Sequence, residues 1–546
     1  MKSEVYNCIK IDSTVITITD QKTVRLLKKG VEKMNEKKIS VNFGMIRRDV
    51  LRHWPIWVMA SVWYLLFVFM VNTTSRYNLS LINIGNKISE NIMISLTENT
   101  AFLAYFLGFA AAIAAFGFLG KKKNDNFFEA LPFNRASLYV TRYIFGFIMW
   151  LIPCLFIFIV EIFQSLVLDA AMFTELLEWL VSAIIAYLFW YSLGILFMVL
   201  CGRVVMAGVC YFGFSAAGIV MSFGIDSMNK LCFIGYNSGT GFSGTPFAIL
   251  SPLEYIFSLG VGYKYIDSRK YIGIFDSANI LKIFVVLFAG IIMAVLAYLL
   301  YKKRKSERTG DNIVFSTMKV VFSYVLSAVT AVTMTFMLTL IIVYHDDRMA
   351  HRASDRIAIL IILCIVGFIT FLASVMWVER KFKIFTKKNL LKAAVFTVIL
   401  AVCGVGYMHD FFNVEGYVPK AKNVSNISIP NNNGLFPNEE RNLLMINEAA
   451  IEKTIELHEI ILEDMYELES FYDNTDAVYY MEGDGFNSYY FNIYYTMKND
   501  MRVSRSYEII KGSHLDNKLR KFIEDNKEIF EKEQYIIYDL EAGYND

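Results

Sequence analysis

The chain has 546 residues, of which 55% are hydrophobic and 19% are charged. This composition is typical of polytopic membrane proteins and excludes an ordinary soluble enzyme. The net charge of +2 hides a division, because residues 410–546 hold 13 Lys and Arg against 27 Asp and Glu, a net charge of −14. We therefore expect a basic membrane part followed by an acidic domain.

Residues 1–39 are polar, and because the first apolar run comes late we expect an extension without a cleavable signal peptide. Residues 40–55 predict an amphipathic helix that lies in the membrane interface. Its apolar and basic side chains occupy different faces, namely Phe43, Ile46, Val50 and Trp54 against Arg47, Arg48 and Arg52. A plain membrane anchor and a specific contact with a partner protein both remain open for this helix.

Nine apolar stretches follow, each long enough to cross a bilayer as a helix, which takes about 20 residues. They cover residues 56–72, 98–119, 138–160, 177–200, 204–223, 279–301, 317–343, 356–377 and 390–408. Their interiors hold almost no ionisable side chains, whereas ion-driven transporters keep such groups at mid-membrane. Glu161 and Glu178 stand at span ends, where we interpret them as solvated carboxylates. The sequence therefore predicts that the chain does no uphill work, or that its energy comes from another protein.

The basic residues predict which loops face the cytoplasm, because Lys and Arg near span ends favour that side. They precede the first span and return in every second loop, at residues 121–123, 203, 302–305 and 380–388. We expect the N-terminus inside and, after nine crossings, the C-terminal domain outside the cell. None of the seven cysteines lies in that domain, so it must fold without disulfides.

The loop after the second span, residues 120–143, carries more than an orienting basic run. After its lysines it reads Phe127–Phe128–Glu129–Ala130–Leu131–Pro132–Phe133–Asn134–Arg135. Exposed aromatic side chains beside a short helix that stops before the proline could dock in a groove of a cytoplasmic partner. The chain itself has no Gly-x-x-x-x-Gly-Lys-Ser/Thr motif, so it cannot be its own ATPase by the usual phosphate-binding fold.

An interfacial helix, two spans and this basic loop resemble the ABC-2 type of ABC-transporter permease. In that family a Leu-Pro-x-Ser/Asn-Arg segment after the second helix forms the coupling helix that contacts the ATPase. Leu131, Pro132, Asn134 and Arg135 match the segment, and Tyr143 stands where the family often has a Lys-Tyr pair. The resemblance implies a permease core of six helices over 56–301, with three further helices over 302–408 placed by hydropathy alone.

Residues 409–546 predict a small α+β domain behind a polar, Asn-rich linker. Residues 446–470 have helical spacing, with His458 as a packed core histidine, and are followed by two strands, Ser488–Met497 and Met501–Ile510. A helix near 514–532 and a last strand, Gln534–Leu540, complete the domain. The order of elements resembles the extracellular C-terminal domain, of unknown function, of some Firmicute ABC-2 permeases. The acidic, Tyr-rich surface leaves open the binding of cationic peptides, against a plain solvated exterior.

Other chemistry finds little support in the sequence. His345, Asp346, Asp347 and His351 are the densest ligand-type group, but arginines share their loop, so an interfacial turn is favoured over a metal site. No local catalytic pattern is found, and nothing suggests nucleic-acid binding. We expect no enzyme activity, metal or cofactor on this chain.

The predicted fold is an all-α polytopic membrane protein with about nine transmembrane helices and a small α+β extracellular domain. The resemblance implies the permease subunit of an ATP-driven exporter in the cell membrane, for drugs or cell-envelope stress. Its partners would be separate ABC ATPase subunits, which hold the ATP, and a second permease chain in a homo- or heterodimer. Residues 127–137 and 40–54 would transmit the motion. A membrane-anchored sensor or antimicrobial-resistance module, and a membrane-embedded enzyme, remain as alternatives.

Overall fold

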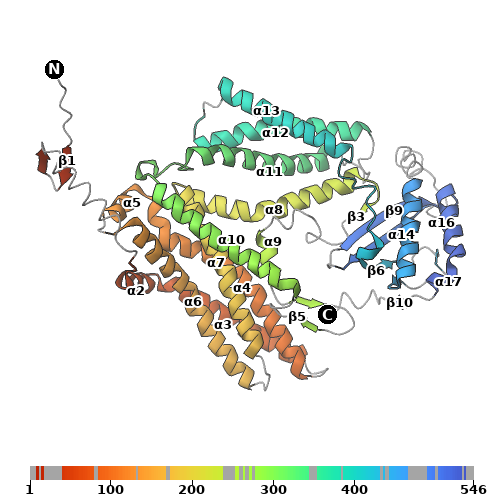
Figure 1. Ribbon diagram of the computed structural model, residues 1–546, viewed down its shortest axis with the longest axis horizontal. Helices are drawn as coiled ribbons and strands as arrows, with labels where there is room; N and C mark the ends of the chain where they lie inside the picture. Colours follow the sequence, from red (N-terminus) through yellow and green to blue (C-terminus); the bar gives the residue numbers. More distant parts are fainter. Residues whose placement is uncertain are drawn as a thin grey trace. The chain divides into compact units, whose positions relative to one another are not determined.

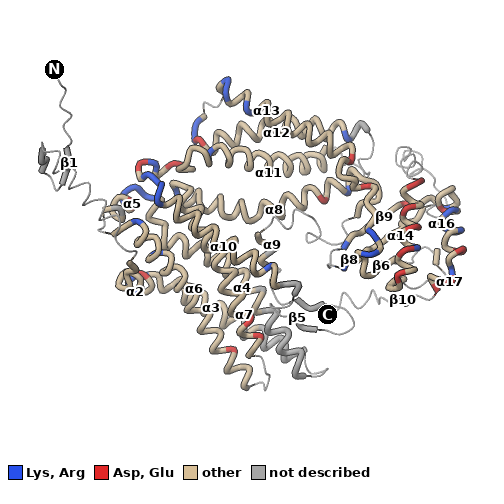
Figure 2. The backbone as a smooth tube through the Cα atoms, in the orientation of Figure 1, with Lys and Arg blue, Asp and Glu red and all other residues tan. Residues whose placement is uncertain are grey.

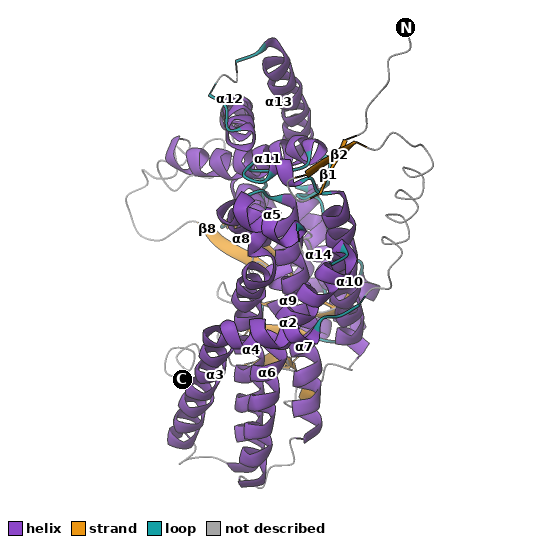
Figure 3. Cartoon of the chain, turned by 90° about the vertical axis from the view of Figure 1, so that its left-hand side faces the viewer, coloured by secondary structure: helices purple, strands orange, loops and turns teal. Residues whose placement is uncertain are grey.

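The computed structural model describes residues 8–11, 14–17, 40–78, 84–130, 133–167, 173–237, 252–257, 262–264, 270–272, 277–342, 353–382, 385–430, 435–436, 442–464, 488–498, 502–531 and 534–536. Helices dominate these residues (Figure 3). Eight of the described helices are long and apolar enough to cross a membrane, and they match the second to ninth predicted spans. The first predicted span lies in α3 (Trp54–Asn78), whose described apolar stretch, Trp54–Phe67, is shorter. The fold class is confirmed, with eight such helices.

The chain divides into two compact units. Unit 1 comprises residues 1–211 and 257–315, and unit 2 comprises residues 212–256 and 316–546. Helix α8 (Val204–Cys232) begins in unit 1 and ends in unit 2. Residues 212–232, most of α8, group with the C-terminal helices.

Unit 1 holds most of the helices of the predicted core (Figure 1). Its elements are β1 (Cys8–Ile11), β2 (Thr14–Thr17), α2 (Phe43–Arg52), α3, α4 (Ile84–Phe116), η1 (Gly117–Gly120), α5 (Lys122–Glu129), α6 (Arg135–Val167), α7 (Phe173–Leu200), the start of α8, β4 (Gly262–Lys264), β5 (Lys270–Ile272), α10 (Ser277–Lys303) and η4 (Ser306–Arg308).

Helix α7 is the most buried of the eight candidate spans and packs closely on α4. A Cβ atom at Gly108 of α4 would lie 3.0 Å from the backbone N of Tyr191, and one at Gly194 of α7 would lie 2.9 Å from Cβ of Ala112. Small residues at these positions let the two backbones approach closely.

Unit 2 contains the remaining candidate spans and the C-terminal domain (Figure 1). Its membrane part consists of residues 212–232 of α8, α11 (Ser316–Ile342), α12 (Ala353–Glu379) and α13 (Lys387–Met408), with most of the short helix α9 (Pro252–Phe257). Met228 and Leu231 of α8 share a buried cluster with Phe336 of α11 and Ile359 of α12. This cluster explains why α8 changes units along its length.

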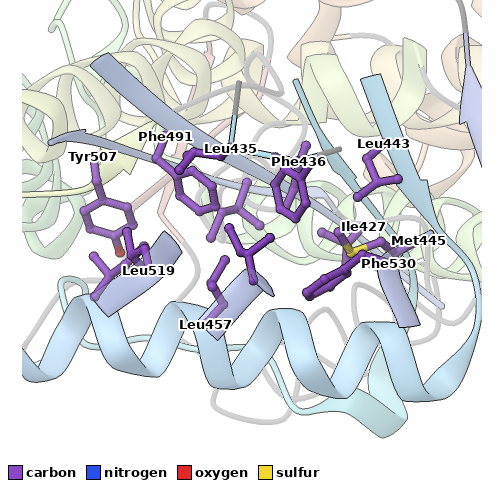
Figure 4. Packing of buried hydrophobic residues seen from close by; sticks show 14 of the residues in the cluster. Ile427, Leu435, Phe436, Leu443, Met445, Leu457, Phe491, Tyr507, Leu519 and Phe530 are labelled. Atoms are coloured by element: carbon purple, nitrogen blue, oxygen red, sulfur yellow. The ribbon is translucent and has the colours of Figure 1, made fainter. Parts of the chain in front are cut away.

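The C-terminal domain is a six-stranded antiparallel sheet with helices, in the strand order β10-β7-β6-β8-β9-β3. Its elements are β3 (Tyr236–Asn237), η5 (Ala421–Asn423), β6 (Val424–Ile429), β7 (Asn442–Met445), α14 (Glu448–Glu463), β8 (Ser488–Met497), β9 (Arg502–Ile510), α16 (His514–Asp525), α17 (Lys527–Phe530) and β10 (Gln534–Ile536). The two predicted strands, Ser488–Met497 and Met501–Ile510, are confirmed as β8 and β9, which pair with Ser488 opposite Ile510. Apolar side chains of the strands and of α14, α16 and α17 form one core (Figure 4).

Residues 410–417, at the start of the predicted linker, are held in place by hydrogen bonds. The carboxylate of Asp410 accepts hydrogen bonds from the backbone N–H groups of Val414 and Glu415. Glu415 in turn accepts a hydrogen bond of 3.0 Å from Ile234 N, just beyond α8, and lies 3.6 Å from Arg356 of α12. The segment therefore binds the ends of α8 and α12.

Two further contacts attach the sheet itself to this segment and to the end of α8. Buried Arg505 of β9 donates hydrogen bonds of 2.7 and 2.9 Å to the carbonyls of Val414 and Tyr417. Strand β3, which follows α8 directly, pairs with β9. Gly235 has a φ of 73°, and a Cβ there would lie 2.0 Å from the Tyr507 ring, so only glycine fits at this turn.

Candidate functional site

The ends of several unit 1 helices meet at one end of the unit, around a buried arginine. Arg304, just after α10, donates hydrogen bonds to the carbonyls of Met198, Val199 and Cys201, near the end of α7. It donates another of 2.7 Å to the carbonyl of Leu119, just after α4. The loops at residues 121–123, 203 and 302–305 are therefore brought together, as the alternation of basic loops predicts (Figure 2).

The loop after α10 is held against the loops after α4 and α7. The Thr309 hydroxyl donates a hydrogen bond of 2.6 Å to the buried carboxylate of Asp125 in α5. Gly202 exchanges backbone hydrogen bonds with Gly310 and Asp311. A Cβ at Gly202 would lie 2.4 Å from the Asp311 carbonyl oxygen, so the close approach requires glycine.

Helix α5 presents two neighbouring phenylalanines in opposite ways. The side chain of Phe127 is 63% exposed, although it is a large apolar group outside the candidate spans. The ring of Phe128 packs on Phe118, with 4.3 Å between the ring centroids. It also lies 4.7 Å from the guanidinium carbon of Arg142, within the range of a cation–π contact.

Arg142 of α6 joins α5 to the interfacial helix α2. Its Nη1 atom lies 2.9 Å from Oδ2 of Asp49 in α2, and both side chains are almost fully buried. The contact is an ion pair and not an aligned hydrogen bond, since Oδ2 accepts none. The start of α2 is fixed to α6 as well, because Ser40 N and Asn42 N donate to the hydroxyls of Ser137 and Thr141. We call Asp49, Phe118, Phe128 and Arg142 the Arg142 junction.

The residues of the predicted apolar face of α2 differ in their exposure. Phe43 and Trp54 are exposed, and so are Arg47 and Arg48. Ile46, however, is only 5% exposed, which corrects the expectation of one apolar face in lipid. The buried side of α2 instead faces protein, as its contact with α6 requires.

The residues of the predicted coupling segment also take different positions. Asn134 accepts a hydrogen bond from Ala136 N at the start of α6. Arg135 donates hydrogen bonds of 3.4 and 2.9 Å to the carbonyls of Lys302 and Arg304, so its guanidinium helps to close the end of α10. Leu131, Pro132 and the side chain of Glu129 lie outside the described residues.

Sequence reasoning missed the buried charges of this region. Arg142 belongs both to the predicted loop 120–143 and to the start of the predicted span 138–160, and it lies eight positions into α6 and is 5% exposed. The available signal was Asp49, the single acidic residue in the basic segment 40–55. Glu161 corrects a second expectation: it is 2% exposed and is therefore not a solvated carboxylate.

Only part of the remaining predicted chemistry lies within the described residues. The loop with His345, Asp346, Asp347 and His351 lies outside them. Within the described part of the chain, no group of three or more His, Cys, Asp or Glu side chains is placed to hold a metal ion. His458 is fully buried, as predicted.

Comparison with protein-family models, with curated proteins and with solved structures finds no match to the chain. Its class follows from its own helices, eight of which have the length and hydropathy of membrane spans. The chain is a multi-pass membrane protein.

Proposed function

We propose that this chain is the permease subunit of an ATP-driven transporter of the ABC-2 type, an exporter in the cell membrane. Separate ATPase subunits would bind its basic end and hold the ATP, and a second permease chain, identical or different, would complete the transport path. The observation that carries the proposal is the exposed Phe127 on the short helix α5, directly beside Phe128 in the Arg142 junction. A large apolar side chain exposed on a supported surface is the usual anchor of a protein interface.

The Arg142 junction supplies a route from such a partner into the membrane helices. A partner that pushes on α5 would press Phe128 against Arg142. Arg142 lies within α6 and is paired with Asp49 of α2. Asp125 of the same short helix contacts Thr309, in the loop after α10. Binding at α5 would therefore act on α2 and α6 and on the loop that follows α10.

Changing Phe127 to Ala is expected to weaken the binding of the ATPase about tenfold or more, because a buried aromatic anchor contributes about 1–2 kcal/mol or more. The tagged full-length chain would be purified from its own host, and the ATPase that copurifies would be measured by its amount and its ATP hydrolysis. Phe127 is exposed, so the variant should fold as the original chain does.

Phe382 offers a matched control, because it is 88% exposed and lies in the basic loop between α12 and α13. Its change to Ala should leave the amount of copurified ATPase unaltered. Failure of any ATPase to copurify with the original chain, or equal loss in both variants, would contradict the proposal.

The attachment of the C-terminal domain favours a sensor as the second candidate function. Strand β3 and Glu415 join the sheet to the end of α8, so a ligand bound to the domain could move a membrane helix. The two functions would give different results in a transport assay. A sensor would respond to the ligand without moving it into or out of sealed vesicles, whereas an exporter with its ATPase would give ATP-dependent transport.

A further inference from the structure

Glu161 is a carboxylate inside a membrane helix, and it takes no part in the proposed coupling route. It belongs to the candidate span Arg135–Leu166 of α6 and is 2% exposed. Its Oε1 atom has no hydrogen-bond partner, and no charged side chain among the described residues offsets its charge. An ionised carboxylate in such a position is unfavourable unless a cation joins it.

A second carboxylate oxygen without a partner lies at the same end of the α6–α7 hairpin. Trp150 Nε1 donates to the Ala183 carbonyl, and the rings of Phe158 and Phe173 lie 6.3 Å apart, so the end of α6 runs beside the start of α7. Glu175 stands in the first turn of α7, and its Oε2 atom is buried without a hydrogen bond. Among the described residues, each of these two carboxylates on neighbouring helices thus has an oxygen without a hydrogen-bond partner.

The surroundings favour an organic cation over a metal ion. Calcium and magnesium require six or more oxygen ligands, and no three acidic or His side chains meet in the described residues. The hairpin is instead rich in aromatic rings, whose faces attract organic cations. Phe158 lies one turn before Glu161 in α6, and Phe173 lies two residues before Glu175 in α7.

The outward surface of the hairpin adds a condition on the ligand. Ile159, Phe163 and Phe173 are more than half exposed on α6 and α7, which is typical of a surface that faces lipid. Glu161 lies two positions from both Ile159 and Phe163 and is therefore on the opposite side of α6, so a ligand that comes from the bilayer must be soluble in lipid and pass between the helices to reach it. We propose that Glu161, with Glu175, binds the positive charge of a lipophilic organic cation at this end of the α6–α7 hairpin. The site stands on its own residues and does not depend on an ATPase.

Equilibrium binding of tetraphenylphosphonium to the full-length chain in lipid nanodiscs tests the proposal. The original chain is expected to bind this cation, and the uncharged triphenylphosphine oxide is expected not to compete. The Glu161→Gln variant, which keeps the shape of the side chain, should bind at least about tenfold more weakly, as loss of a desolvated charge partner requires. Glu178→Gln, in the same hairpin, is the matched control and should bind as the original chain does.

A thermal unfolding midpoint at or above that of the original chain would show that Glu161→Gln is folded, since it removes an unpaired charge. Equal affinity of the folded Glu161→Gln variant would overturn the proposal. Competition by the uncharged compound would overturn it as well. So would the absence of phosphonium binding to the original chain together with uptake of a proton by the Glu161 carboxylate.

Discussion

Changing Asp49 to Asn is expected to lower the free energy of unfolding by about 3–5 kcal/mol, the usual cost of leaving a buried charge without its partner. The side chains of Asp49 and Arg142 are 4% and 6% exposed, so water cannot replace the lost carboxylate. The other neighbours of the guanidinium in the Arg142 junction are the rings of Phe118 and Phe128, which attract a cation far less than a carboxylate does. Thermal unfolding of the purified chain in detergent, followed by its loss of helical circular dichroism, would measure the change.

Two further variants separate the buried charge from a general effect on α2. Arg48 also contacts Asp49, at 3.4 Å, but it is 70% exposed, so Arg48→Gln should change stability by less than about 1 kcal/mol. The double variant Asp49→Asn with Arg142→Met removes both charges and should recover part of the loss. Equal stability of the original chain and Asp49→Asn would contradict this account of the Arg142 junction.

The membrane spans were predictable because hydropathy is a local property. Spans expected at 317–343, 356–377 and 390–408 correspond to α11, α12 and α13 within a few residues. Hydropathy alone, however, treats every ionisable residue near an end as part of a loop. Arg142 lies inside α6 and is stabilised by Asp49, which is distant in sequence, so no local pattern could place it in the bundle.

The C-terminal sheet shows the same limit in another form. Strand β8 was predictable because its side chains alternate between buried and half-exposed along most of its length. Strand β6 was missed because its pairing with β8 shifts between Val424 and Asn426, so the buried Val424 and Ile427 are three positions apart. Such an irregularity breaks the period of two that identifies a strand. Strand β3 has only two residues and depends on a partner strand far away in the sequence.

Part of the candidate site could be predicted from the sequence, but only with the help of the resemblance to ABC-2 type permeases. The sequence predicted exposed aromatic side chains in the segment 127–135, and Phe127 is exposed. The sequence could not show the role of Arg135, because its hydrogen bonds go to the carbonyls of Lys302 and Arg304, which are far away in the sequence. Contacts of this kind depend on the packing of whole helices and leave no motif.

Mild acid is expected to destabilise the C-terminal domain through His458. The imidazole is fully buried, with Nδ1 2.8 Å from the Tyr495 hydroxyl and Nε2 2.7 Å from the Tyr507 hydroxyl. Burial, and to a lesser degree the charge of Arg505, lowers the pKa of His458 from 6.5 to about 3. Between these values the unfolded domain binds one more proton than the folded domain. The stabilisation is therefore complete above pH 6.5 and is lost as the pH falls, by up to about 1.4 kcal/mol for each pH unit.

Hydrogen exchange of the full-length chain between pH 7 and 5, corrected for the intrinsic rate, would measure this loss of protection in α14, β8 and β9. Most carboxylates titrate below this range, so the histidine dominates the change. His458→Gln should be less stable at pH 7, because Gln cannot reach both hydroxyls, but its protection should vary less with pH. His514→Gln is the matched control, since the His514 side chain is 77% exposed, and it should follow the original chain. Because the folded domain must exclude a proton from His458, equal pH dependence in the original chain and His458→Gln would mean that the imidazole is not held neutral.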